Sequence, residues 1–98
     1  MARPRKPSVQ TLRVLEALAR AGGEWRYGLE LAEATKLKSG TLYPILMRLE
    51  ERGLVEARWL EPTAPGRPPR HGYRILAAGR ELIHASGATP EPKRAVIA

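Results

Sequence analysis

The sequence lacks cysteine and phenylalanine, and it has no long apolar run. Without cysteine there is no disulfide framework and no Cys-ligated zinc or iron–sulfur site. No stretch approaches the roughly 18 apolar residues that a membrane-spanning helix needs. The basic N-terminus has no apolar segment behind it, so it does not resemble a secretory signal. We therefore expect a cytoplasmic, nucleoid-associated protein with no membrane partner.

Groups for catalysis are also scarce. His71 and His84 are the only histidines. The chain has no glycine-rich phosphate-binding loop and no cluster of metal-ligand residues. Glu50 and Glu51 are neighbours near a predicted helix end and point to different sides, as surface charges do. We expect no enzyme activity, no cofactor and no metal.

Positive charge is abundant and unevenly spread. The 98 residues carry a formal net charge of +7. Basic residues are in excess over residues 1–20 and 57–98, whereas residues 21–56 are nearly balanced. Basic ends around a near-neutral middle favour a polyanionic partner. Ribosomal, membrane-surface and DNA-binding proteins all share this feature.

Hydrophobic periodicity divides the chain into one small domain, residues 8–86, between a basic arm (1–7) and a flexible tail (87–98). Ser8 is expected to cap the first helix, which Gly22–Gly23 end. Further helices are predicted over residues 29–34, 40–52 and 77–86, with Ser39 as N-cap and Gly53 as the stop of the third helix.

Between the last two helices the hydrophobic period changes from 3.6 to 2. Val55, Ala57 and Trp59 are the inward positions of one predicted strand, and a second covers residues 73–76. The intervening residues 61–72 hold four prolines and two glycines, which predicts a stiff loop. The fold class is mainly α with a small β hairpin: a winged helix-turn-helix with three helices, a two-stranded wing and a short C-terminal helix.

The third helix carries the first candidate site. Opposite its apolar stripe, its early turns hold Ser39, Thr41 and Tyr43, groups that suit DNA phosphates near a helix N-terminus. Pro44 is expected to cost little in these turns, and it offers apolar surface to a thymine methyl. Two of these side chains also have a plainer interpretation, since Ser39 could be only a cap and Thr41 only solvated. Tyr43 is harder to dismiss, because it falls off the apolar stripe of the helix.

The wing is the second candidate site. Arg67 and Arg70 lie on the proline-stiffened loop, with His71 beside them, so docking would cost little entropy. The Gly-Arg-Pro at residues 66–68 resembles the core of an AT-hook, a minor-groove motif, although Pro65 replaces its first arginine. A solvated basic loop is the alternative. Arg5 belongs to a second possible minor-groove arm, for which simple disorder is equally plausible.

The residues that we assign to the DNA-binding surface are Lys36, Lys38, Ser39, Gly40, Thr41, Tyr43, Pro44, Arg48, Arg67, Arg70, His71 and Arg5. The alternative function is a winged-helix module that contacts protein or RNA, in which Trp25, Trp59 and the tail would form an interface.

Two segments resemble the PadR-like transcriptional regulators: "YGLELAEATKLKSGTLYPILMRLEERGLVEARW" and "GRPPRHGYRILAAGRELI". Their Ser-Gly-Thr-Leu-Tyr-Pro run, the following Leu-x-x-Leu-Glu-x-x-Gly-Leu and the closing Tyr73-to-Arg80 motif are typical of that family. The resemblance covers about residues 9–86. It implies a dimeric winged-helix repressor on a roughly palindromic duplex DNA operator, with the recognition-helix residues and the wing at the DNA.

Departures from the family pattern qualify what the resemblance implies. Lys36 stands where many members have a turn glycine, so either the turn is strained or its geometry differs. The last helix is short, so a homodimer would have to use it together with the first helix. A pocket for a small-molecule effector between subunits would then be small or absent.

Overall fold

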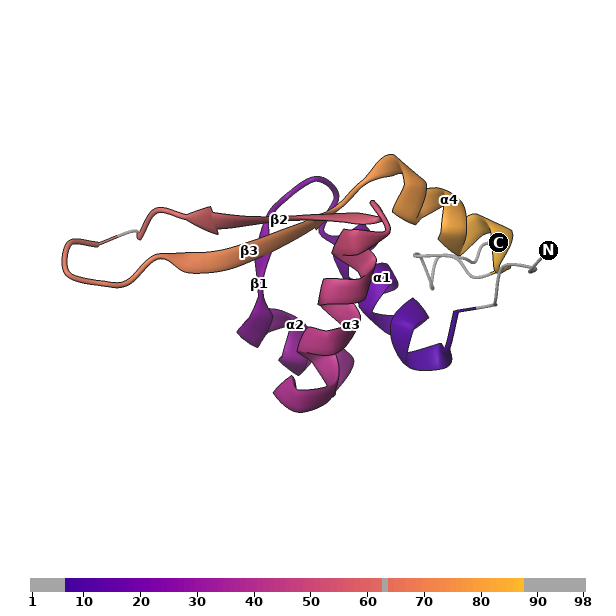
Figure 1. Cartoon of the computed structure of the whole chain (residues 1–98), viewed down its shortest axis with the longest axis horizontal. Helices are drawn as coiled ribbons and strands as arrows, with labels where there is room; N and C mark the ends of the chain where they lie inside the picture. The colour runs from indigo at the N-terminus through magenta and orange to yellow at the C-terminus, as the bar shows by residue number, and fades with distance from the viewer. Residues whose placement is uncertain (1–6, 63, 88–98) are drawn as a thin grey trace, which may run out of the picture.

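The computed structural model of the chain describes residues 7–62 and 64–87. Its elements are α1 (Val9–Arg20), β1 (Arg26–Tyr27), α2 (Gly28–Thr35), α3 (Ser39–Glu51), β2 (Val55–Leu60), β3 (Arg70–Ile75) and α4 (Ala77–Ala85). The helices gather at one end of the molecule, and β2 and β3 extend beyond them as a long wing (Figure 1). Arg5 and most of the predicted arm and tail lie outside the described residues.

The core forms where the apolar stripes of the helices meet the base of the sheet. Ser8 caps α1 as predicted, because its hydroxyl accepts the Thr11 N–H at 3.1 Å. The buried hydrophobic residues come from α1, α2, α3, α4 and the sheet. They are Val14, Leu15, Leu18, Ala19, Leu31, Leu42, Ile45, Leu46, Leu49, Leu54, Val55, Tyr73, Ile75 and Ile83. The predicted stripe of the third helix is thus confirmed in full.

The sheet has one strand more than predicted. The short β1 pairs antiparallel with β3, through Arg26 opposite Tyr73 and Tyr27 opposite Gly72. The strand order is β1-β3-β2, so β3 is central. The winged helix-turn-helix is confirmed. The two-stranded hairpin of the prediction is completed by a strand that joins the wing to the start of α2.

The beginning of α3 differs from the prediction. The N-cap is Lys38, with extended backbone, and Ser39 is the first helical residue. The Lys38 carbonyl accepts the N–H groups of Thr41 and Leu42 at 2.9 and 2.8 Å. The prediction of Ser39 as N-cap was therefore wrong. The predicted stop is confirmed, since Gly53 follows the helix with a φ of +73°.

The wing also differs, because β3 begins at Arg70 rather than at residue 73. Arg70 and His71 pair with Leu60 and Trp59, so they belong to the strand and not to the loop. The prolines end at residue 69, which leaves the chain free to pair from there. Trp59 was expected to point into the core, but it is 66% exposed, because this part of the wing extends past the helices (Figure 1).

Lys36 joins α2 to α3 in a left-handed conformation. Its φ and ψ are 65° and 25°, and its N–H donates to the Ala32 carbonyl at 2.9 Å. Among the described residues it is the only one besides glycine with positive φ. The strained turn, one of the two alternatives that the sequence left open, is the one observed.

Replacing Lys36 with glycine should therefore stabilise the domain. Glycine adopts this conformation without a Cβ clash, which costs other residues about 1–2 kcal/mol. Part of that gain is offset by the greater freedom of glycine in the unfolded chain. We expect the free energy of unfolding in urea to rise by about 0.5–1 kcal/mol. Lys36→Ala, which removes the same charge but keeps the Cβ, should give no such rise; an equal rise would contradict the strain.

Candidate nucleic-acid interface

The exposed side of α3 presents a compact set of small, polar and apolar groups. Because the apolar stripe faces the core, Gly40, Pro44 and Met47 lie on the opposite side of the helix. Thr41 and Arg48 flank them and are exposed as well. Met47, at 59% exposure, was not assigned to the site from the sequence, although its spacing from Pro44 places it on the same face.

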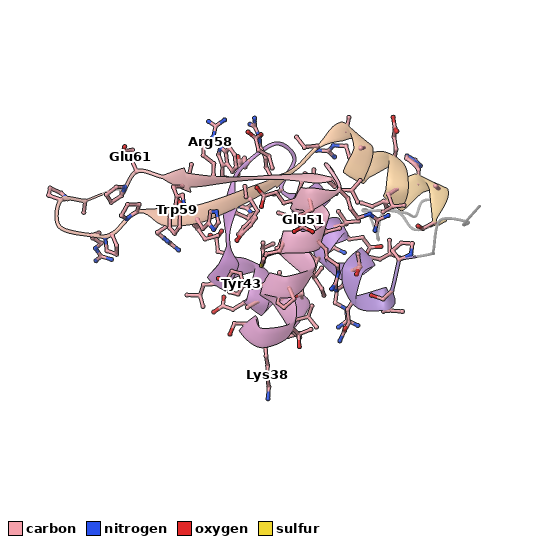
Figure 2. All side chains as sticks on the ribbon, in the orientation of Figure 1. Lys38, Tyr43, Glu51, Arg58, Trp59 and Glu61 are labelled. Carbon is pink, nitrogen blue, oxygen red and sulfur yellow. The ribbon has the colours of Figure 1, made fainter. Side chains whose placement is uncertain are left out.

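The N-terminus of α3 is open to a ligand. Lys38 makes no side-chain cap hydrogen bond, and it points away from the body of the domain at the tip of the helix (Figure 2). The N–H groups of the first helical turn therefore have no capping side chain, and the helix dipole adds partial positive charge. Ser39 and Lys36 are also exposed near this end. This arrangement suits an anionic oxygen.

Pro44 interrupts the hydrogen bonds of α3 instead of sitting among its unpaired first N–H groups. It is the sixth residue of the helix, so its nitrogen cannot donate to the Gly40 carbonyl. The prediction that Pro44 lies among the unpaired N–H groups of the first turn was therefore wrong. Both residues lie on the exposed side, where water can satisfy the carbonyl.

Tyr43 packs between α3 and the start of α2. The side chain is 39% exposed, and its hydroxyl lies so close to Gly28 that a Cβ there would collide with it. Glycine at residue 28 thus makes room for the tyrosine ring. Tyr43 shows one edge to solvent and also fixes the spacing of the two helices.

The wing carries its basic residues in two settings. Gly66 turns the loop with a φ of +85°, and the Arg67 N–H donates to the Ala64 carbonyl at 3.3 Å. This turn differs from the extended Gly-Arg-Pro of an AT-hook. Arg70 is the first residue of β3, and its guanidinium carbon is 3.6 Å from the centre of the Tyr27 ring. Arg67 and Arg70 nevertheless line one hollow with Pro68.

His71 is part of a stack of rings on the core-side face of the wing. Its ring lies parallel to that of Trp59, with centroids 4.4 Å apart and an interplanar angle of 4°. Its Nδ1 is 3.2 Å from the hydroxyl of Tyr73. Burial raises the pKa of the Tyr73 phenol, and the nearby Tyr43 and Glu50 add to the effect. The sequence placed His71 near the arginines but did not reveal this stack.

On the opposite face of the wing, charged side chains link the two strands to each other. Trp25 lies near Arg58 and Arg74, whose guanidinium carbons are 5.2 and 4.6 Å from the ring centre. Glu56 pairs with both arginines, at 3.0 and 2.9 Å. The hydrogen bond from Arg74 holds the pKa of the Glu56 carboxyl below its usual value. These contacts couple the strands, so this face stiffens the wing.

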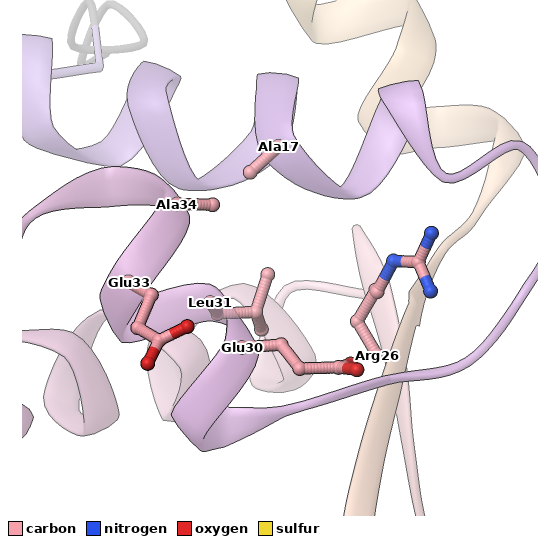
Figure 3. Close-up of a pocket in the computed structure, with 6 residues that line it drawn as sticks. All are labelled: Ala17, Arg26, Glu30, Leu31, Glu33 and Ala34. Atoms are coloured by element: carbon pink, nitrogen blue, oxygen red, sulfur yellow. The ribbon is translucent and has the colours of Figure 1, made fainter.

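A groove away from this surface lies between α1 and α2 and is lined by side chains of both charges. Arg26 faces it together with Glu30 and Glu33 (Figure 3). The Glu30 carboxylate also accepts the Tyr27 N–H at 3.0 Å. Because carboxylates repel phosphates, this groove is less suited to DNA than the surface of α3 and the wing.

Residues 7–62 and 64–87 contain no group of three or more His, Asp or Glu side chains placed to hold a metal ion. They also contain no helix with the length and apolar character needed to span a bilayer.

Solved structures with this fold include transcription regulators. A crystal structure of NadR in complex with 4-hydroxyphenylacetate is 30% identical, covers 82% of this chain and 52% of NadR, and has a TM-score of 0.65. The chain thus spans about half the length of NadR. A PadR family regulator from Eggerthella lenta DSM 2243 is also 30% identical, with coverage of 76% of this chain and 68% of its own and a TM-score of 0.61.

A further structure supports the fold alone. The PadR family regulator from hypervirulent Clostridium difficile R20291 is 21% identical, covers 82% of this chain and 84% of its own, and has a TM-score of 0.69. No curated protein matches the sequence. The model of the transcriptional regulator PadR-like family matches residues 12–85, which is most of the chain. This chain therefore belongs to the PadR-like family of winged-helix, DNA-binding transcriptional regulators, a family of regulators and not of enzymes.

Proposed function

We propose that this chain is a sequence-specific repressor that binds duplex DNA with α3 in the major groove and the wing over a neighbouring minor groove. The observation that carries the proposal is the uncapped N-terminal end of α3, whose exposed side holds Gly40, Thr41 and Pro44. Recognition helices enter the major groove with this end. Arg67 and Arg70 would follow from the wing, in the neighbouring minor groove.

The proposed contacts divide into two kinds. Phosphates would be held by basic and hydroxyl groups, and base edges would be met by the small and apolar groups on the exposed side of α3. The first kind comprises Lys36, Lys38, Ser39, Thr41, Arg48, Arg67 and Arg70. The second comprises Gly40, Pro44 and Met47. Tyr43 reaches the same surface by its exposed edge, whereas His71 acts through the ring stack.

The active form in this proposal is a homodimer that occludes a promoter. Two copies would join through α1 and α4, which pack against each other and lie at the end of the molecule away from the wing tip (Figure 1). A small pocket lies between these helices, lined by Ala19, Arg80, Ile83 and His84. With α4 only nine residues long, any effector site between subunits would be small.

Selection of binding sites from a random duplex pool tests this proposal. A dimer should enrich a palindromic sequence whose half-sites lie about one helical turn, 10–10.5 base pairs, apart. Sedimentation of the protein with the selected duplex should give two chains per site. A pool without enrichment would contradict sequence-specific binding, and one chain per enriched site would contradict the dimer.

Tyr43→Ala should weaken binding to the selected duplex by about tenfold or more, since it removes both the DNA-facing edge and the contact that sets α2 against α3. Fluorescence anisotropy of labelled duplex measures the affinity, and circular dichroism monitors the fold. Tyr43→Phe is the matched control, because it keeps the ring packed near Gly28. Unchanged affinity in a folded Tyr43→Ala protein would remove Tyr43 from the site.

A further inference from the structure

Trp59 leaves a large apolar ring in water. Its side chain is 66% exposed, although a buried indole would contribute substantial hydrophobic stabilisation. The stacked His71 ring covers one face of the indole. With that face covered and most of the residue still accessible, the other face is open to solvent.

The open indole is held in a defined position. His71 joins it to Tyr73, whose ring centroid is 5.1 Å from the imidazole and whose side chain belongs to the core. Backbone pairing fixes Trp59 opposite His71 and Ala57 opposite Tyr73. A rigid aromatic side chain loses little conformational entropy when it binds. The stack therefore prepares the free face of Trp59 for a partner.

The indole lines a cleft between the wing and the helices. The cleft has a volume of about 470 Å³ and is lined by Tyr27, Gly28, Leu29, Tyr43, Trp59, Arg70 and His71. Trp59 points from the wing to the side on which Tyr43 lies, whereas Arg58 points to the opposite side (Figure 2). The walls are mostly aromatic rings, with one guanidinium held over Tyr27.

Resting on the proposed function, we infer that this cleft holds the sugar–phosphate backbone of one DNA strand, with Trp59 against a deoxyribose and Arg70 beside a phosphate. The strand that separates the major from the minor groove must pass between α3 and the wing if each occupies its own groove. The apolar C–H groups of a deoxyribose suit an indole face, and a phosphate suits a guanidinium.

The inferred contact fixes where the protein sits on the duplex but does not read sequence. Trp59 should therefore contribute equally to the affinity for cognate and for unrelated DNA. It is an uncharged contact, so its loss should leave the salt dependence of binding unchanged, in contrast to the loss of Arg70.

Single-tryptophan variants test the inference. Trp25→Phe leaves Trp59 as the only tryptophan, and Trp59→Phe leaves Trp25, which sits between Arg58 and Arg74 on the opposite face. Each is saturated with a mixed-sequence duplex at about 50 mM salt, where binding without specificity is strong. We expect the acrylamide quenching constant to fall at least twofold for Trp59 and to stay unchanged for Trp25.

The outcomes separate the inference from the proposed function. If anisotropy shows that the duplex binds while the quenching of Trp59 is unchanged, the inference is wrong and DNA binding stands. If no duplex binds even at low salt, the proposed function fails as well. As a second measurement, Trp59→Ala should weaken binding to cognate and scrambled duplex by the same factor, about fivefold, with an unchanged salt slope. A loss confined to cognate duplex would contradict the backbone contact.

Discussion

Replacing Arg67 and Arg70 together with alanine is expected to weaken binding to duplex DNA by about 10- to 100-fold near physiological salt and to lower the salt slope by about 2. The reason is that the two side chains share one hollow on the wing, so both can reach phosphates of the same groove. Each phosphate contact that is lost removes about one released counterion from the slope.

The matched control removes the same charge elsewhere. Arg58→Ala with Arg80→Ala also lowers the net charge by two, but Arg58 is paired with Glu56 and Arg80 hydrogen-bonds the Gly22 carbonyl beyond α1. This variant should keep the slope within about half a unit of the parent, since long-range attraction is screened. Equal losses in both double variants would mean that overall charge, and not the wing, governs binding.

Gly79→Ala is expected to lower the free energy of unfolding by about 1–2 kcal/mol. A Cβ at this position of α4 would meet the backbone carbonyl of Leu54 and lie 2.8 Å from Cγ1 of Ile75. That carbonyl already accepts the Leu76 N–H at 3.0 Å, so it cannot move without breaking the link between α3, the sheet and α4. The better helix propensity of alanine offsets part of the overpacking cost.

Urea denaturation measures the free energy of unfolding of Gly79→Ala, and Gly40→Ala is the matched control. Gly40 is also in a helix, but a Cβ there would have no atom within 4 Å outside its own helix backbone. Gly40→Ala should therefore raise the free energy of unfolding by up to about 1 kcal/mol, in line with propensity alone. If Gly79→Ala were as stable as the parent, the close approach of α4 to the Leu54 carbonyl would be refuted.

The sequence predicted those features that depend on regular hydrophobic spacing. The spacing of four leucine and isoleucine residues predicted the buried face of α3, and the change of the hydrophobic period from 3.6 to 2 predicted the wing. The three helix ends that depend on Ser8, Gly22 and Gly53 were also predictable, because each uses a specific capping or turn chemistry.

Other features depended on contacts between distant residues. Arg26–Tyr27 is too short to show a period, and it becomes a strand only because β3 lies beside it. Trp59 keeps the alternation of a half-buried strand, yet no core reaches that far along the wing. Lys38 and not Ser39 is the N-cap of α3, because Lys38 has the extended backbone of a cap and Ser39 is already helical.

Part of the candidate site was likewise visible only in three dimensions. The sequence assigned the front of α3 and the wing arginines to one surface. It did not indicate that Tyr43 fits against Gly28, that Met47 joins the exposed face, or that His71 supports Trp59. Each of these depends on which side of an element faces its neighbour.

The most direct test of the central claim is fluorescence anisotropy of duplex DNA from the chain's own upstream region against a scrambled duplex, over a salt series. We expect tight preference for the upstream duplex, and a logarithm of affinity that falls steeply with the logarithm of salt concentration for both. Equal, weak binding to the two duplexes at every salt concentration would contradict a regulator that acts on its own promoter. An affinity that does not change with salt concentration would contradict a wing that binds phosphates.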